Sequence, residues 1–479
     1  MSFISPLFYV GLAAAGIAFY WIPGRLRAIY LLALSYAFYA LSSWVYLLLL
    51  ITASATTYAI GLRIVSGKSD EGRSRLMLLG VAFIVAVIVA FKAAGAATGF
   101  LLPLGLSYYS FKLISYLIEV YWDQESVERD PVIFFLYPAF FPQIVSGPIQ
   151  RPETSFRQMR EIMARAARDP QIEAGFRYII GGLMLKLLIG DRLADFIHKV
   201  DGAHNDFTYA TMLATVACYT LQLYADFAGY TNIALGVGKI FGIEGPPNFN
   251  APFVAVNIQE MWRRWHMSLT SWLTDYLFTP LSMFLRSLRQ AGLIISIMLN
   301  MVIVGVWHGF TLNYLVFGLL HGFFLSVTVL ALVALRARRD GMGKRGEATS
   351  RTTRLLSATA TGAGRVLTFA LMSFTQIFFH SETWDQSVSI LKQVAGLTPS
   401  GSQTLMSLGP GVAGSVMLCA AVAVFDGSGA PGVRWACAQL DKAAPRWLQY
   451  GACLFLLAVL STDSGSRFVY GQFWLGQSE

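Results

Sequence analysis

Two histidines stand in surroundings that favour proton-transfer chemistry. His308 follows ten residues with one polar side chain, Asn300, and Gly309 comes directly after it. His266 precedes it by 42 residues and lies in the polar and aromatic stretch 257–280. An ionisable group in so apolar a segment costs free energy unless it faces an interior cavity. Because histidine titrates near neutral pH, the pair indicates general acid–base catalysis by His308 and His266.

Other readings of these histidines stay open at this point. His321 lies in the next apolar run, and three histidines also suit a metal or haem. A metal site normally includes a carboxylate or cysteine close by, so the sequence predicts no metal here. A lone histidine in an apolar helix is equally compatible with a hydrogen-bonded packing residue.

The stretch 257–280 is expected to form one helix. Spacings of three and four residues place six residues on one face of such a helix: Gln259, Trp262, Arg263, His266, Thr270 and Leu273. The alternative is an amphipathic helix lying on a membrane surface. Asp226, in the apolar run before this stretch, requires a partner, and the sequence suggests Arg263 or Arg264.

A wider set of polar and aromatic residues is expected to contact the substrate or donor. It consists of Trp307, Arg263, Arg264, Trp262, Asp275, Tyr276, Asp226, Tyr230, Asn232, Gln143, Arg151 and His321.

The elements that must position these residues are membrane helices. Only 13% of the 479 residues are charged and 55% are hydrophobic, too few charges to cover a water-facing surface. Apolar segments occupy 5–22, 30–61, 76–98, 174–195, 208–228, 311–335, 364–380, 410–425 and 447–461, with less uniform ones at 101–122, 131–148 and 291–308. We expect an all-α polytopic membrane protein of about 10–12 membrane helices, because only closed backbone hydrogen bonding is stable in lipid.

The distribution of basic residues predicts the membrane topology of the chain and excludes nucleic acid as a binding partner. Basic residues cluster in the loops 63–75, 151–168 and 336–354, which the positive-inside rule places in the cytoplasm. Three apolar segments separate the first two loops, so one segment must be re-entrant or interfacial. The best candidate is the proline- and glycine-rich segment 140–151; an ordinary helix end broken by prolines is the alternative.

Five sequence motifs together resemble a known family. They are LPLGLSYYSFKLISYLIEVY (102–121), FFPQIVSGPIQRPETSF (140–156), YADFAGYTNIALGVGKIFGI (224–243), RRWHMSLTSWLTDYLFTPL (263–281) and GVWHGFTLNYLVFGLLHG (305–322). In this order they resemble the membrane-bound O-acyltransferase (MBOAT) family, in particular its bacterial alginate O-acetyltransferase branch. The near-invariant family histidine matches His308, and the second family site matches His266. The branch often has His where this chain has Gln143, and Arg where it has His380.

The resemblance implies a single membrane domain over 1–479, with core motifs at 102–335 and C-terminal helices at 364–461. A funnel would bring a cytoplasmic acyl donor to an acceptor on the other side of the bacterial inner membrane. The expected reaction moves an acyl group, acetyl in the first instance, from acetyl-CoA or a carrier-protein thioester to a hydroxyl of a cell-surface polysaccharide or glycolipid. No permanently bound cofactor is expected.

Two further function classes remain as alternatives. A proton-coupled transporter or flippase would use His266, His308 and Asp226 as a relay, although the sequence lacks the matching halves typical of transporters. An acyl-relay scaffold would instead pass the acyl group to a separate periplasmic transferase. The resemblance implies such a partner, of acetyltransferase or esterase type, together with polysaccharide machinery.

Overall fold

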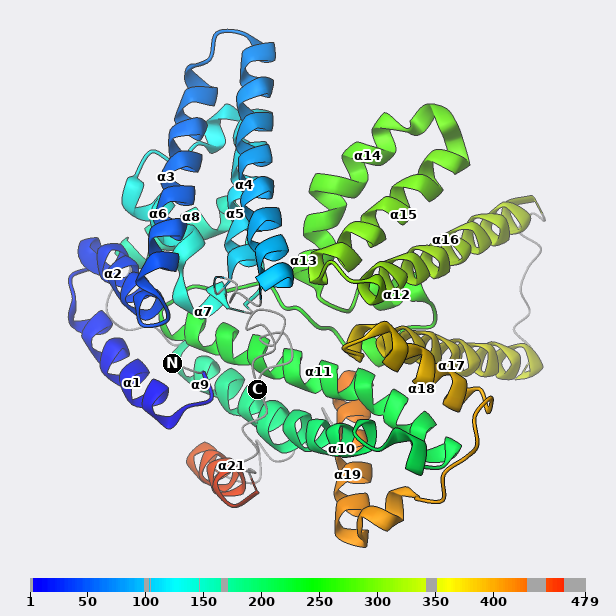
Figure 1. Ribbon diagram of the computed structural model, residues 1–479. Helices are drawn as coiled ribbons and strands as arrows, with labels where there is room; N and C mark the ends of the chain where they lie inside the picture. Colours follow the sequence, from blue (N-terminus) through cyan, green and yellow to red (C-terminus); the bar gives the residue numbers. More distant parts are fainter. Residues whose placement is uncertain are drawn as a thin grey trace. The chain divides into compact units, whose positions relative to one another are not determined.

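The computed structural model describes residues 3–98, 103, 105–145, 147–164, 171–341, 351–428 and 445–460. Apart from an isolated bridge between Phe207 and Gln403, the described residues form helices, turns and loops (Figure 1). Contacts group the chain into two units, and each is described here by itself. Parts of two basic loops, 165–170 and 342–350, lie outside the described residues, as does Cys437.

The first unit comprises the described residues within Met1–Met184 and Phe227–Pro247. Its helices are α1 (Pro6–Trp21), α2 (Arg27–Ala40), α3 (Trp44–Ser66), α4 (Asp70–Thr98), α5 (Leu106–Trp122), α6 (Pro131–Ala139), α7 (Phe141–Ile144), α8 (Pro152–Ala164), α9 (Gln171–Leu183) and the second part of α11 (Tyr209–Ile240). Helices α3 and α4 form a long hairpin (Figure 1).

The second unit comprises Leu185–Asp226 and Asn248–Ser466. Its longer helices are α10 (Asp191–Asp201), the first part of α11, α15 (Arg289–His308), α16 (Leu312–Gly341), α17 (Arg351–His380), α18 (Trp384–Val394), α19 (Pro410–Ser428) and α21 (Arg446–Leu460). Three shorter helices precede α15: α12 (Ile258–Trp262), α13 (Met267–Leu273) and α14 (Thr279–Phe284).

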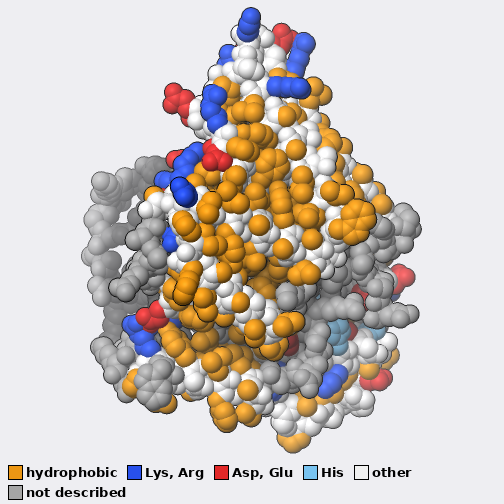
Figure 2. Space-filling view, turned by 90° about the vertical axis from the view of Figure 1, so that its left-hand side faces the viewer, with side chains coloured by type: hydrophobic (Ala, Val, Ile, Leu, Met, Phe, Trp, Pro, Cys, Tyr) orange, Lys and Arg blue, Asp and Glu red, His pale blue; other side chains and the backbone are white. Residues whose placement is uncertain are grey.

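The helical membrane fold expected from composition is confirmed. Among the described residues, five helices are long and apolar enough to cross a bilayer: Trp44–Ser66, Asp70–Gly95, Arg286–His308, Leu312–Leu335 and Ala360–His380. Shorter apolar helices are Pro6–Trp21, Pro410–Asp426 and Leu448–Val459. Figure 2 shows hydrophobic side chains spread over one face, below a tip where charged side chains gather. The large apolar side chain of Trp21 is 87% exposed, which suits a lipid-facing surface.

Two apolar segments that looked continuous are broken by local chemistry. The run 30–61 is divided between α2 and α3 at Leu41–Ser43, where Ser43 adopts extended backbone and its Oγ accepts a hydrogen bond from the Tyr46 N–H. In 131–148, Asp130 caps the start of α6 and Pro138 lies in its last turn, so the helix ends at Ala139.

The irregular segment after α6 is buried by protein. Gln143, Ile144, Ile149 and Gln150 are all less than 4% exposed. Gln143 accepts a hydrogen bond from the buried Lys112 Nζ at 3.1 Å, and Lys112 also donates to the Tyr137 carbonyl. Irregular backbone is stable at membrane depth under this condition of burial. Its re-entrant course stays a prediction.

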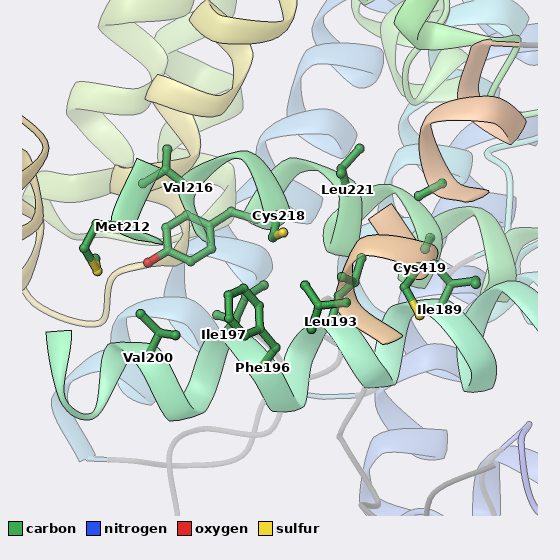
Figure 3. Packing of buried hydrophobic residues seen from close by; sticks show 14 of the residues in the cluster. Ile189, Leu193, Phe196, Ile197, Val200, Met212, Val216, Cys218, Leu221 and Cys419 are labelled. Atoms are coloured by element: carbon green, nitrogen blue, oxygen red, sulfur yellow. The ribbon is translucent and has the colours of Figure 1, made fainter. Parts of the chain in front are cut away.

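The core of the second unit lies where α10, α11 and α19 meet. On α10, Leu193, Ile197 and Val200 recur at helical spacing and belong to one buried cluster with residues of α11 such as Cys218 (Figure 3). Cys419 of α19 contributes to the same cluster as a free buried thiol, which is ordinary packing for this residue type.

Glycines permit the close packing of α15 against α16. A Cβ placed on Gly305 would lie 2.2 Å from the Tyr314 carbonyl oxygen, and one on Gly318 would lie 2.6 Å from the Met301 carbonyl oxygen. Both distances are far below van der Waals contact, so only glycine allows the two backbones to approach this closely. The hairpin thereby fixes the position of His308 at the end of α15.

We expect Gly305→Ala to destabilise the protein by about 1–3 kcal/mol, because the added methyl group forces the two helix backbones apart. Thermal unfolding of the purified protein in detergent measures the effect. Gly362→Ala is the matched control, since a Cβ at Gly362 meets nothing within 4 Å. An unchanged melting temperature for Gly305→Ala would contradict the close-packing argument.

Candidate active site

His308 ends α15 inside a group of aromatic rings of the second unit. Its ring centroid lies 4.5 Å from that of Trp307 and 4.8 Å from that of Phe379 on α17. Tyr314 and Phe317 of α16 complete the group, each at 6.1 Å. The side chain is half-buried. The imidazole of His308 is thus held between aromatic rings, with part of its surface accessible.

His266 lies in a turn rather than on a helix face. Its backbone is left-handed, with φ 43° and ψ 51°, between the end of α12 at Trp262 and the start of α13 at Met267. A positive φ is uncommon for residues other than glycine, although histidine adopts it more often than most; Ala251 and Arg289 have it too. The expected single helix over 257–280 is therefore wrong, because its hydrogen bonding is interrupted at 263–266 and changes to a π turn at Thr274–Phe278.

A neighbouring loop braces the turn at His266. Asn248 accepts hydrogen bonds from the Met267 N–H at 2.9 Å and, through its side-chain oxygen, from the Ser268 hydroxyl at 2.6 Å. The Asn250 N–H donates to the Arg264 carbonyl at 3.0 Å. These bonds satisfy backbone groups that the interrupted helix leaves exposed, and they hold the unusual backbone of His266 in place.

Trp307 lies near both histidines. The Trp307 ring centroid is 6.4 Å from that of His266 and 4.5 Å from that of His308. Two histidines 42 positions apart in the sequence thus lie near the same indole ring, and their catalytic role stays a prediction. His266 is 2% exposed, whereas His308 is half-buried, so the two imidazoles occupy different environments.

Burial sets the protonation state of His266. Removal from water disfavours the charged imidazolium and lowers the pKa of His266 to about 3. His266 is therefore neutral at physiological pH, with one ring N–H to donate and one ring nitrogen to accept.

The arginines near His266 do not share its face. Arg263 is exposed, while Arg264 donates to Glu260 at 2.9 Å and to the Asn250 carbonyl at 3.1 Å. The expectation that Arg263 and His266 point the same way is wrong, because the helix ends between them. Arg264 instead stabilises the local turn.

The remaining candidates of this stretch differ in exposure. Trp262 is buried, and its ring packs edge to face against His321 at 5.2 Å. Asp275 is exposed on the π turn, and the half-buried Tyr276 lies 5.2 Å from the Trp272 ring. Asp275 thus lies on an outer surface of the turn, not in the aromatic group around His308.

Asp226 has a different partner from the one expected. Its carboxylate pairs with the buried Lys186 at 2.5 Å, and the same ammonium pairs with Asp191 at 2.5 Å. All three side chains are at most 4% exposed. The assignment of Arg263 or Arg264 as partner is wrong, because Lys186 reaches Asp226 from the π turn at Met184–Gly190.

Four predicted site residues belong to the first unit. Gln143 and Tyr230 are buried, while Arg151 and Asn232 are half-buried. Gln143 is held by Lys112, as described above. Their part in the same site as the histidines stays a prediction.

Sequence reasoning missed several residues that shape the site. Phe317, which was missed, stands four residues before the predicted candidate His321, a spacing that places both on one face of α16. Phe379 and Thr375 on α17 and the bracing Asn248 carry no such local signal. They reach the site only through tertiary contacts.

Comparison with known proteins agrees with the resemblance of the motifs. The sequence model of MBOAT, the membrane-bound O-acyltransferase family, matches residues 31–345. The protein named "Probable alginate O-acetylase AlgI" from Pseudomonas aeruginosa is 32% identical over 329 residues, covering 64% of this chain and 62% of its own length.

Relatives with other names are also similar. A peptidoglycan O-acetyltransferase from Helicobacter pylori is 28% identical, covering 59% of this chain and 60% of its own length. A teichoic acid D-alanyltransferase from Bacillus subtilis is 34% identical, covering 43% of this chain and 53% of its own length. The chain thus spans about three-fifths or less of the length of these relatives. Since the family match extends over more than half of the sequence and includes both histidine motifs, the chain belongs to the membrane-bound O-acyltransferase family.

Proposed function

We propose that the protein transfers an acyl group, acetyl in the first instance, from a cytoplasmic thioester to a hydroxyl of a cell-surface polysaccharide or glycolipid. The observation that carries this proposal is the approach of His266 and His308 to the single Trp307 ring. The names of the relatives support the reaction class, since they describe O-acetylation of alginate, O-acetyl transfer to peptidoglycan and D-alanyl transfer to teichoic acid.

In the proposed mechanism, His308 is the general base. Its neutral imidazole takes the proton of the acceptor hydroxyl as the oxygen attacks the thioester carbonyl. The tetrahedral oxyanion then collapses, the carbon–sulfur bond breaks, and the thiolate leaves with the proton held by His308. Neutral His266 donates a hydrogen bond to the carbonyl oxygen, where negative charge develops. Such a site accelerates the reaction through proton transfer and through positioning of the reactants.

The surroundings of the site suit an anionic donor. Arg263 is exposed beside the turn that carries His266. A basic residue at this position attracts the phosphates of CoA or an acidic carrier protein. We propose the inner membrane of a bacterium as the location. A periplasmic acetyltransferase or esterase-like protein, with the polysaccharide machinery, is the proposed partner that receives or delivers the acyl group.

We expect His308→Ala to lower acyl transfer at least about 100-fold, because acid–base catalysis contributes about 10²- to 10⁴-fold. The assay uses purified protein in detergent, radiolabelled acetyl-CoA, and mannuronate oligosaccharide, cello-oligosaccharide or glycerol as acceptor. Released CoA and acetylated product are measured separately. A folded His308→Ala protein with wild-type turnover would refute the role of His308.

The same assay separates the alternatives. His198→Ala, at an exposed position of α10, is the matched histidine control and is expected to keep wild-type turnover. Turnover in detergent, where no membrane gradient exists, distinguishes an enzyme from a proton-coupled transporter. An acyl relay would release CoA without forming acetylated product. Adding the periplasmic partner would then restore product formation.

Burial of His266 predicts a pH dependence of stability. The pKa of His266 is lowered in the folded protein, so below the ordinary value of about 6.5 the unfolded chain binds a proton that the folded protein does not. Stability from neutral His266 is therefore fully present above about pH 6.5 and decreases as the pH falls toward the folded-state pKa.

We expect wild-type stability to fall by up to about 1.4 kcal/mol per pH unit more than that of His266→Asn between about pH 6 and pH 5. Asparagine tolerates the left-handed backbone and does not titrate. Melting temperatures of both proteins across this range measure the difference. Parallel pH curves would show that His266 is not buried in its neutral form.

A further inference from the structure

Trp262 and His321 form a second polar position beside the candidate catalytic group. The two rings pack edge to face with centroids 5.2 Å apart and an interplanar angle of 78°. Trp262 is 7% exposed and His321 is fully buried. Trp262 ends α12 and His321 lies in α16, so the pair joins the segment of His266 to the helix that follows His308.

The hydrogen bonds around His321 define its tautomer. The Thr375 hydroxyl donates its single proton to the Met372 carbonyl at 2.7 Å. It therefore has only lone pairs to offer to His321 Nε2, which lies 3.0 Å away. We assign the hydrogen of the neutral ring to Nε2 on this ground, which leaves Nδ1 as a hydrogen-bond acceptor.

The unused polar atom of one ring is a hydrogen-bond acceptor, and that of the other ring is a donor. Among the residues that the structure describes, neither Nδ1 of His321 nor Nε1 of Trp262 has a hydrogen-bond partner. Nδ1 requires a donor, and the indole Nε1–H requires an acceptor. Buried polar atoms left without partners are costly, and in native proteins each requires an explanation. A hydroxyl group is both donor and acceptor, so it satisfies both requirements.

An aromatic wall connects this position to His308. The Phe317 ring lies 4.5 Å from His321 and 6.1 Å from His308, in both cases edge to face. Phe317 is 3% exposed. His308 and His321 therefore both lie against the Phe317 ring.

We propose that His321 Nδ1 and Trp262 Nε1–H form a subsite that binds a hydroxyl group of a substrate, distinct from the hydroxyl that His308 deprotonates. The hydroxyl donates to His321 and accepts from Trp262. Two sources have this chemistry: a second hydroxyl of the acyl acceptor, and the pantetheine hydroxyl of the thioester donor. The inference rests on the proposed acyl transfer, and it adds a positioning role for these two residues.

Two substitutions of His321 separate recognition from structural support. The amide of asparagine lies at the distance of imidazole Nδ1 from the backbone, and that of glutamine lies at the distance of Nε2. His321→Asn thus keeps an acceptor for the hydroxyl and loses the bond to Thr375, whereas His321→Gln keeps that bond and loses the acceptor. Trp262→Phe removes the N–H and retains a ring.

We expect KM to rise about tenfold for His321→Gln and Trp262→Phe, with kcat changed less, because one buried hydrogen bond to substrate is lost. His321→Asn is expected to keep a KM within about threefold of wild type. Trp265→Phe is the matched control, since this buried indole packs against Phe249 at 5.1 Å instead. KM is measured with acetyl-CoA and with the best acceptor among mannuronate oligosaccharide, cello-oligosaccharide and glycerol, and melting temperatures verify folding.

The substrate whose KM rises identifies the source of the hydroxyl. A rise for the acceptor alone assigns the subsite to the acceptor, and a rise for acetyl-CoA alone assigns it to the donor. Wild-type KM values for both substrates in folded His321→Gln and Trp262→Phe would overturn the inference while leaving the proposed function intact. A larger rise in KM for His321→Asn than for His321→Gln would assign His321 to structural support and would also overturn the inference. Absence of turnover in the wild type would overturn both proposals.

Discussion

The close approach of α15 and α16 is the constraint on which the site depends. Backbone meets backbone at Gly305 and Gly318, where any side chain would overlap a carbonyl oxygen. In lipid, no hydrophobic driving force brings apolar helices together. Close van der Waals packing of this kind therefore determines how they associate. The register of the hairpin then places His308 at the end of one helix opposite Phe317 and His321 on the other.

Polar groups in the apolar interior are stabilised by local bonding. Lys186 lies between the carboxylates of Asp191 and Asp226, all nearly inaccessible to solvent. An unpaired charge would be expensive there, whereas a paired one ties the π turn to α11. Asn248 has a comparable role with neutral groups, because it satisfies the backbone at the interrupted helix beside His266.

The helical membrane fold and the family could be predicted from the sequence, whereas the catalytic role of His308 and His266 stays a prediction. Scarcity of charge and long apolar runs indicated membrane helices, and the surroundings of His308 and His266 marked them as unusual. Helix continuity was predicted less well. The apolar run 30–61 contains no proline or glycine before Gly61, yet the cap at Ser43 divides it. The stretch 257–280 has helical spacing throughout, and its interruption at His266 depends on tertiary bonds.

By itself, the sequence determined the solvent of the protein, its helical class, its family motifs and the two histidines, because composition and residue type act locally. The tertiary structure alone determined which side chains pair with one another and which are buried. It paired Asp226 with Lys186 rather than Arg263 or Arg264, and it buried His266 while leaving His308 partly accessible. Such pairings depend on distances between segments far apart in the chain, and pKa values depend on burial. Neither quantity is encoded in the spacing of residues along one helix.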